Sequence, residues 1–221
     1  MRNRYVVRFS PSERLAHWIQ FLAFVALLVT GLPNFSRSMR SYAVGRSGQT
    51  NRIWHRVAAL VYIGSPLIYL FGNPRAFFSS LREAFVWTRD DWVWLARAWD
   101  YYTHGNVSDL PPQGKYNAGQ KLNVLLQIVA YTFFVTTGLL MWFKEKVTSP
   151  VAFTWSVIIH DLATIANSCM VMLHVYLVTI HPLTRESILS MVEGVVTREY
   201  AAKHHAKWIA EIEGSHGHGG D

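Results

Sequence analysis

Charged residues are scarce in this chain. Of its 221 residues, 16% are Asp, Glu, Lys or Arg, whereas soluble domains average about 25%. Hydrophobic residues make up 51%, and they include 9 Trp, 10 Tyr and 12 Phe. This composition suits a chain whose solvent is partly lipid, because aromatic residues gather at the two interfaces of a membrane. Its length alone would allow one or two soluble domains, but the apolar runs described below argue against them.

Cysteine is almost absent as well. Cys169 is the single cysteine, so the chain has no internal disulfide and no Cys-x-x-Cys pair for zinc or an iron–sulfur cluster. We expect Cys169 to pack as a small apolar residue. The net charge is +7, but the basic residues do not form a patch with interleaved aromatics. They stand between apolar runs, which favours a role in membrane topology over nucleic-acid binding.

Four apolar runs predict four membrane-spanning helices, since about 20 apolar residues cross roughly 30 Å of hydrocarbon. The second run is short, so its helix is expected to begin nearer Asn51. The expected fold class is all-α, an integral membrane four-helix bundle with a soluble C-terminal helical extension. The bundle domain covers residues 1–181, and the extension and its disordered tail cover 182–221. The apolar runs are 15–35, 57–72, 122–143 and 151–180.

Signals for helix ends frame these runs. Ser10-Pro11-Ser12-Glu13 has the pattern of a capping box, so the first helix begins before its apolar run and His17 lies in its second turn. Ser149-Pro150 gives the fourth helix a similar start, and His181-Pro182 marks its end. Basic residues followed by an apolar run also resemble a signal peptide, but the run is long for that purpose and a retained span is favoured.

The distribution of positive charge predicts the topology. With the N-terminus inside, 14 of the 21 Lys and Arg residues fall in inner segments, which favours an inner N-terminus and an inner C-terminus. The first outer loop is nevertheless basic, and its arginines are alternatively explained by a partner protein or by haem propionates. The long inner loop is predicted to contain an interfacial amphipathic helix near residues 80–102.

Four histidines lie inside the spans or at their edges: His17, His55, His160 and His174. An ionisable residue within a bilayer is costly and indicates a functional site. A single buried histidine is more often structural, but four at matched depths are harder to explain that way. His17 and His174 lie towards the inner ends of their helices, and His55 and His160 towards the outer ends.

The spacing on the fourth helix indicates two haems. His160 and His174 are 14 residues apart, which is about 3.9 turns and roughly 21 Å along the axis. A haem held between two helices needs one imidazole from each, and two haems stacked across a bilayer need this spacing. A single metal centre is the weaker alternative because the pairs are far apart. A proton relay is the other alternative, although Asp161 is the one acidic residue well inside a span.

Several segments also match a known family. They are Glu13-Arg14-Leu15-Ala16-His17-Trp18, Thr30-Gly31, Gly114-Lys115-Tyr116-Asn117-Ala118-Gly119-Gln120-Lys121, Thr137-Gly138-Leu139, His174-Val175-Tyr176, Glu193-Gly194-Val195 and Ala202-Lys203-His204-His205-Ala206-Lys207-Trp208. With His55 and His160, these residues resemble the gamma subunit of membrane-bound formate dehydrogenases, the cytochrome b556 family. The likeness covers nearly the whole chain.

The resemblance implies roles for individual residues. His55 and His160 would ligate an outer haem b, and His17 and His174 an inner one. A quinone pocket would lie near Asn117 and Gly119, with His174 adjacent. An Asn side chain can hydrogen-bond a quinone carbonyl, and Gly lets the ring approach the backbone. The alternative for Asn117 is a helix cap. Separately from the resemblance, Arg56 or Arg52, which flank His55, is a candidate partner for a propionate of the outer haem, with a simple loop charge as the alternative.

The resemblance also implies a place in a complex. Electrons would pass from an iron–sulfur subunit through the two haems to menaquinone or ubiquinone, while formate is oxidised on a separate molybdenum or tungsten subunit. The chain would sit in the bacterial inner membrane with both termini in the cytoplasm. One alternative is the equivalent cytochrome b subunit of a hydrogenase or of another molybdo-oxidoreductase. A non-redox membrane anchor or transporter is another.

Overall fold

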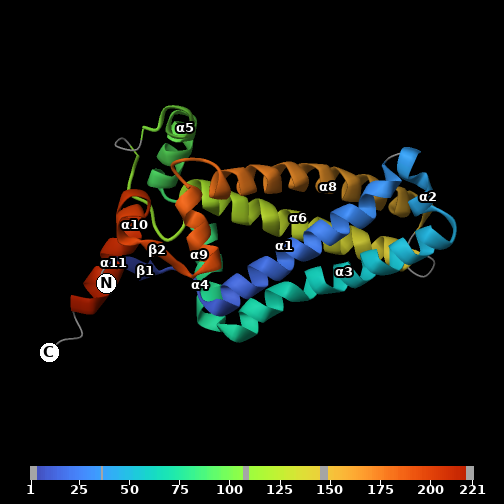
Figure 1. Ribbon diagram of the computed structural model, residues 1–221, viewed down its shortest axis with the longest axis horizontal. Helices are drawn as coiled ribbons and strands as arrows, with labels where there is room; N and C mark the ends of the chain where they lie inside the picture. The colour runs from blue at the N-terminus through green and yellow to red at the C-terminus, as the bar shows by residue number, and fades with distance from the viewer. Residues whose placement is uncertain (1–3, 36, 107–109, 145–148, 218–221) are drawn as a thin grey trace. The chain divides into compact units, whose positions relative to one another are not determined.

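The computed structural model describes residues 4–35, 37–106, 110–144 and 149–217, which are almost entirely helical (Figure 1). Four helices are long and apolar enough to cross a membrane, and at most 17% of each apolar window is buried. The predicted all-α class with four membrane helices is confirmed, and the chain is a multi-pass membrane protein. The four are α1 (Pro11–Gly31), α3 (Gly45–Gly72), α6 (Ala118–Trp142) and α8 (Pro150–Thr179).

Shorter elements connect and extend these helices. The region expected to form one interfacial helix near 80–102 forms two, because the chain breaks after Phe85 and Thr88 caps a new helix with Asp91. The last helix continues to Gly217, and the end of the predicted tail, 218–221, lies outside the described residues. The shorter elements are β1 (Tyr5–Val7), η1 (Leu32–Asn34), η2 (Arg37–Met39), α2 (Arg40–Ala43), α4 (Pro74–Phe85), α5 (Arg89–His104), η3 (Arg185–Ser187), α9 (Ile188–Val192), β2 (Val195–Thr197), α10 (Arg198–His204) and α11 (Ala206–Gly217).

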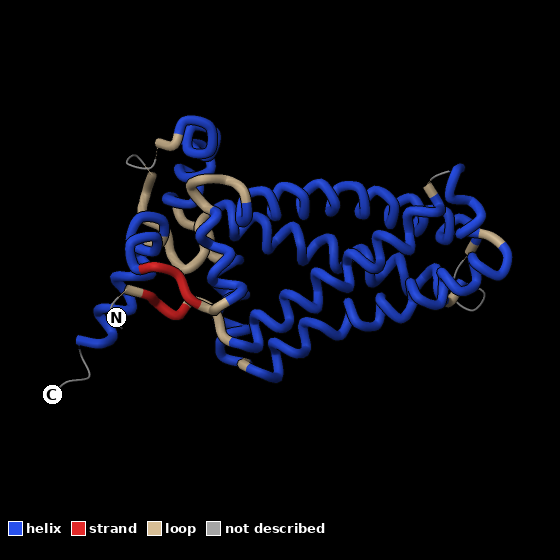
Figure 2. Tube along the Cα trace, viewed as in Figure 1, coloured by secondary structure: helices blue, strands red, loops and turns tan. Residues whose placement is uncertain are grey.

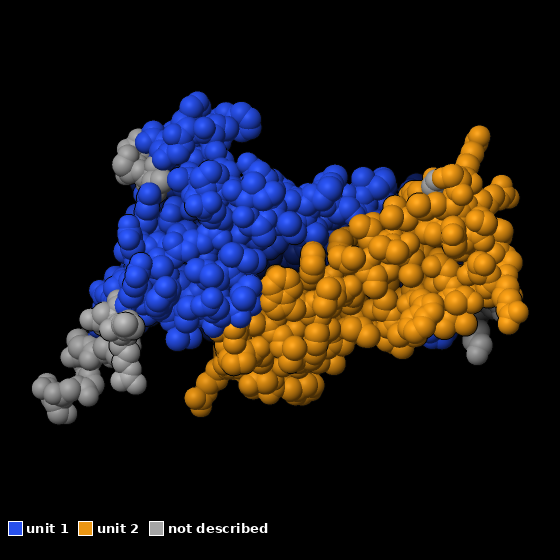
Figure 3. Space-filling model, in the orientation of Figure 1, with its two compact units in different colours: residues 1–8, 78–221 blue, residues 9–77 orange. Residues whose placement is uncertain are grey.

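Contacts divide the chain into two compact units, which Figure 3 colours separately. One unit is residues 9–77, and the other combines the segment before Phe9 with 78–221. In the unit that contains residues 78–221, the C-terminal extension packs with the loop between the second and third spans, as the contacts of Tyr101 with His204 and of Asp90 with Lys207 show. The domain boundary expected at residue 181 stays a prediction.

The unit of residues 9–77 is an antiparallel hairpin of α1 and α3 (Figure 1). The predicted capping box begins α1, since the backbone N–H of Ser10 donates to Glu13 at 2.7 Å and the Ser10 hydroxyl accepts from Glu13 N–H at 3.4 Å. At that end the Tyr69 hydroxyl donates to Glu13 at 2.7 Å. At the other end the Asn51 side chain donates to the Thr30 carbonyl at 2.6 Å. Polar contacts therefore set the register of this hairpin at both ends.

Pro66 lies inside α3. Proline has no N–H, so it cannot donate to the carbonyl four residues earlier, which belongs to Tyr62. The Ser65 hydroxyl donates to that carbonyl instead, at 2.9 Å. The neighbouring side chain thus satisfies the acceptor that the proline leaves open.

The second unit contains the hairpin of α6 and α8 and a polar lobe. Ser149 caps α8 by accepting from the Ala152 N–H at 3.2 Å, as predicted. Cys169 is exposed on α8 rather than packed in a core, because small apolar side chains on a membrane helix are stable against lipid as well. This corrects the expectation for that residue.

A short sheet joins the two ends of the chain within the second unit. β1 pairs antiparallel with β2, with Tyr5 opposite Thr197 and Val7 opposite Val195 (Figure 2). The sheet packs on a small core of Val196, Tyr200, Ala201, Trp208 and Ile209. The segment before the first span therefore meets the segment after the last, which is possible because an even number of spans leaves both on the same side.

Candidate functional site: two histidine depths and a polar cavity

Each hairpin carries one predicted histidine near each of its ends. In the α1–α3 hairpin, His17 lies in the second turn of α1, and His55 packs beside Thr30 at the far end of that helix. The 13-residue step from His17 to Thr30 is roughly 20 Å on a helix. On α8, His160 and His174 are 14 residues apart, or roughly 21 Å. All four side chains are half-buried. The axial distance between the two histidine positions is therefore nearly the same in both units.

His55 is held by the end of α1. Its Nδ1 lies 2.8 Å from the Thr30 hydroxyl oxygen. That hydroxyl also lies 2.7 Å from the carbonyl of Ala26, one turn earlier in the same helix. A Cβ built on the next residue, Gly31, would lie 3.8 Å from Cε1 of the His55 ring.

His160 repeats this arrangement in the other unit. Its Nδ1 lies 2.8 Å from the Thr137 hydroxyl oxygen, which also contacts the Phe133 carbonyl at 2.5 Å. A Cβ on Gly138 would lie 3.8 Å from Cε1 of His160. Two Thr-Gly pairs on different helices thus orient two histidines in the same way. From the sequence, both pairs were noted only as parts of a family pattern.

The four histidines fit haem better than a metal ion bound by protein ligands alone. The described residues contain no group of three or more His, Cys, Asp or Glu side chains that could share a metal. A bis-histidine haem asks for only two imidazoles, because the porphyrin supplies the other iron ligands. The contacts to Nδ1 of His55 and His160 would leave Nε2 as the nitrogen for a haem iron, as in other histidine sites whose second nitrogen is held by the protein.

Asn117 and Gly119 lie together at the start of α6. Asn117 is the N-cap of that helix, accepting from the Gln120 N–H at 2.9 Å, and its own N–H donates to the Gln120 side chain at 3.2 Å. The side-chain oxygen of Asn117 therefore acts as a helix cap, which was the alternative to quinone binding. A Cβ on Gly119 would come within 3.1 Å of the Trp94 ring, so glycine permits close packing against α5.

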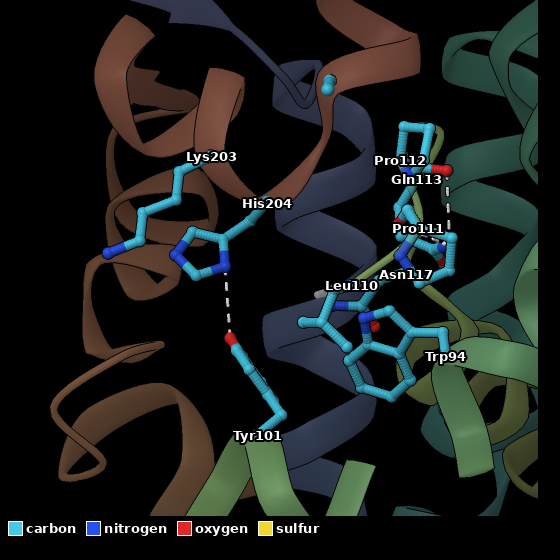
Figure 4. Close-up of a pocket in the computed structure, with 10 residues that line it drawn as sticks. Trp94, Tyr101, Leu110, Pro111, Pro112, Gln113, Asn117, Lys203 and His204 are labelled. Carbon is cyan, nitrogen blue, oxygen red and sulfur yellow. Dashed lines mark hydrogen bonds between the residues drawn. The ribbon is translucent and has the colours of Figure 1, made fainter. Parts of the chain in front are cut away.

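Asn117 also lines a cavity of about 130 Å³, shown in Figure 4. Trp94 and Tyr101 of α5, Gln113 and His204 line the same cavity, whereas His174 does not. The Tyr101 hydroxyl and Nδ1 of His204 are hydrogen-bonded at 3.1 Å, as the dashed line between these two side chains in Figure 4 marks. Sequence reasoning assigned no role to Trp94, Tyr101, Gln113 or His204. The one sequence feature that pointed to this cavity was the His204-His205 pair in the C-terminal segment.

Electrostatics keep this cavity wall uncharged at neutral pH, apart from Lys203. Burial, reinforced by the nearby Lys203 ammonium, lowers the pKa of His204 to about 4. Burial raises the pKa of the Tyr101 hydroxyl well above its ordinary value. A neutral hydroxyl and a neutral imidazole in contact can accept and pass on a proton without carrying a lasting charge.

Buried polar contacts hold the irregular segment that leads into α6. Arg8 is 4% exposed and donates to the Lys115 carbonyl at 2.6 Å and to the Gln120 side chain at 2.9 Å. His205 is fully buried, and its Nδ1–H donates to the Gly114 carbonyl at 2.9 Å. Burial lowers the pKa of His205 well below its ordinary value. The segment around Gly114 and the segment around His205, both of which match the family pattern, are therefore packed together.

The two arginines near His55 differ. Arg52 donates to the Ala43 carbonyl at 3.2 Å, which ties the start of α3 to α2. Arg56 is exposed, and its proposed contact with a propionate stays a prediction.

Comparisons with known proteins find relatives that match nearly the whole chain. The chain is 28% identical over 218 residues to the formate dehydrogenase cytochrome b556(fdo) subunit of Escherichia coli K12, covering 96% of this chain and 95% of that protein. It is 27% identical to the nitrate-inducible cytochrome b556(Fdn) subunit of the same organism, with 96% and 94% covered. It is 24% identical to the formate dehydrogenase cytochrome b556 subunit of Haemophilus influenzae, with 93% and 83% covered.

These relatives confirm the resemblance found in the sequence. The model of the prokaryotic cytochrome b561 family matches residues 8–194, which include all four membrane helices and all four histidines. The chain belongs to the prokaryotic cytochrome b561 family.

Proposed function

We propose that the chain is the dihaem cytochrome b subunit of a formate dehydrogenase complex. It takes electrons from an iron–sulfur subunit, passes them through two b haems to a quinone, and anchors the complex in the membrane. The observation that carries this proposal is the matched placement of the histidines. His17 lies roughly 20 Å along α1 from Thr30, which contacts His55, and His160 lies roughly 21 Å from His174 on α8. The named relatives, which are subunits of formate dehydrogenases, support the choice of complex.

Each haem takes one histidine from each hairpin in this proposal. His55 and His160, whose Nδ1 atoms are held by threonines, ligate one haem, and His17 and His174 ligate the other. When bound, haem supplies a one-electron carrier whose potential depends on its axial ligands and their hydrogen bonds. Arg56 is the candidate partner for a propionate, because guanidinium pairs bidentately with carboxylate.

The quinone site is proposed at Asn117 and Gly119, with His174 adjacent. The oxygen of Asn117 is used by the helix cap, which leaves its Nδ2–H groups to donate to a quinone carbonyl. Quinone reduction also consumes two protons. In this proposal the hydrogen-bonded pair of Tyr101 and His204, in the wall of the cavity that Asn117 lines, relays them.

The proposed orientation puts both termini and this cavity on the cytoplasmic side of a bacterial inner membrane. The excess of Lys and Arg in the corresponding segments supports it. The pairing of β1 with β2 supports a common side for the two termini. Labelling of single cysteines introduced into α11 in intact cells and in inverted vesicles would test it, and reaction in intact cells would refute it.

Haem content tests the ligand assignment. A pyridine haemochrome assay should find two b haems in the wild-type chain and one after His160→Ala. His104→Ala is the matched control, because His104 is an exposed histidine outside the four spans and its removal should leave two haems. One haem or none in the wild type would refute the dihaem proposal, and full occupancy in His160→Ala would refute the pairing.

The identity of the electron donor needs the native complex. We expect a molybdenum or tungsten formate dehydrogenase subunit and an iron–sulfur subunit to co-purify with this chain. Formate should then reduce its haems in membranes. Haem reduction by hydrogen but not by formate would favour the hydrogenase alternative.

A further inference from the structure

We propose that Thr30 and Thr137 are positioning residues that fix the protonation of both axial imidazoles of one haem and hold the reduction potential of that haem low. The inference rests on the proposed function in one respect, namely that His55 and His160 ligate the same haem. The evidence for the inference itself is the geometry within each hairpin.

The direction of the hydrogen bonds follows from the carbonyl contacts. The Thr137 hydroxyl oxygen lies 2.5 Å from the Phe133 carbonyl, and the Thr30 hydroxyl oxygen lies 2.7 Å from the Ala26 carbonyl. Two oxygens approach this closely only when a proton lies between them, and a carbonyl has none to give. Each hydroxyl therefore donates its single proton within its own helix. Its oxygen must then accept from the histidine Nδ1–H, 2.8 Å away.

The same tautomer follows at both histidines. Because each Nδ1–H donates to a threonine oxygen, Nδ1 carries the proton and the lone pair is on Nε2 in His55 and in His160.

The chemical consequence is a more basic pair of ligands. An acceptor on Nδ1–H draws that proton away from the ring, which raises the electron density at Nε2. A more basic ligand stabilises ferric over ferrous iron and so lowers the potential. Because the hydroxyl is itself polarised by a backbone carbonyl, it is a better acceptor than an isolated hydroxyl. Both sides of one haem would receive this effect.

The glycines beside the threonines complete the arrangement. A Cβ on Gly31 or Gly138 would only touch Cε1 of the ring, at 3.8 Å, so the imidazoles alone do not require glycine there. Cε1 is bonded to Nε2, and a bare backbone beside it leaves room for the porphyrin next to the iron-binding nitrogen.

Spectroelectrochemical titration of the two haems tests the proposal. The variants are Thr30→Val, Thr137→Val and the double variant, which keep the shape and remove the hydroxyl. We expect the double variant to raise the reduced-to-oxidised ratio of one haem by about tenfold at fixed ambient potential, which is about 59 mV for a one-electron couple. The haem of His17 and His174 should keep its potential and serves as an internal reference.

Two controls separate the role of the hydroxyl from simple packing. Thr132→Val removes a threonine on α6 that also donates to the carbonyl one turn earlier, that of Ile128 at 2.9 Å, and should shift neither potential. Thr137→Ser restores the hydroxyl and should restore the wild-type potential. If a valine variant loses haem, the serine variant carries the test, since a hydroxyl alone should restore both occupancy and potential.

The outcomes distinguish this inference from the proposed function. Two haems in every variant with unchanged potentials would overturn the inference and leave the dihaem assignment intact. A serine variant that behaves like valine would overturn it as well. A wild-type chain without two haems would instead refute the proposed function. Equal shifts in both haems would show that His55 and His160 do not share one haem.

Discussion

The buried ion pair between Lys121 and Asp91 yields a prediction that the structure alone supplies. The two side chains are 8% and 4% exposed, and Lys121 Nζ lies 3.0 and 3.1 Å from the carboxylate oxygens of Asp91. Burial by itself raises the pKa of the Asp91 carboxyl, but hydrogen bonds from Thr88 and Lys121 outweigh it and hold the pKa below its ordinary value. The carboxylate is therefore charged at neutral pH. The pair fixes α5, and with it Trp94, against the start of α6.

Lys121→Met should leave this carboxylate buried without its cation. Breaking one side of a buried pair costs about 3–5 kcal/mol. Asp91 keeps two hydrogen bonds from Thr88, at 2.7 and 2.9 Å, so we expect the lower end, about 3 kcal/mol. Asp91→Asn should cost a similar amount, because the buried Lys121 ammonium would lose its counter-charge and keep only neutral acceptors such as the Val86 carbonyl at 3.0 Å. The double variant should cost much less than the sum of the two.

Equilibrium unfolding in mixed detergent and SDS micelles measures these free energies. The matched control is Lys207→Met, because the ion pair of Lys207 with Asp90 has side chains that are 41% and 38% exposed and should contribute less than about 1 kcal/mol. Equal losses for Lys121→Met and Lys207→Met would refute the reasoning. So would strictly additive losses in the double variant, since they would mean that the two buried charges do not interact.

Three further outcomes are expected. In the assembled complex, Asn117→Ala should slow quinone reduction while both haems still reduce, and a normal rate would place the quinone elsewhere. The unfolded chain binds more protons than the folded one between the folded pKa of His204, about 4, and its unfolded pKa of about 6.5. Stability should therefore fall as pH drops through this window, by up to about 1.4 kcal/mol per pH unit from His204. His204→Asn should reduce the pH dependence of thermal unfolding, and His205, whose pKa is also lowered, should account for part of what remains. Finally, formate oxidation in sealed vesicles should charge the membrane, because electrons would move inward from the outer haem to the quinone. Each electron moved against a potential of 100 mV stores about 2.3 kcal/mol. An unchanged potential-sensitive dye would refute a transmembrane electron path.

Local features of this protein were predictable from its sequence. The four spans follow from hydropathy and length, because the thickness of the bilayer sets how many apolar residues a helix needs. The cap at Ser10 and Glu13 follows from residues three positions apart, and it places His17 in the second turn of α1. The spacing of His160 and His174 follows from helical geometry alone. Each of these depends on neighbours within one helix.

Contacts between distant residues were decided only by the tertiary structure. Thr30 meets His55 and Thr137 meets His160 across 25 and 23 positions. A following glycine distinguishes these threonines from Thr132, but nothing in the local pattern indicates which histidine each one meets. The sheet of β1 and β2 went unpredicted because each strand has three residues and forms only when the other is present. Asn117 shows both levels. Its capping role is legible from Gln120 three residues later, whereas the cavity it faces exists only because α5 and His204 come from elsewhere in the chain to enclose it.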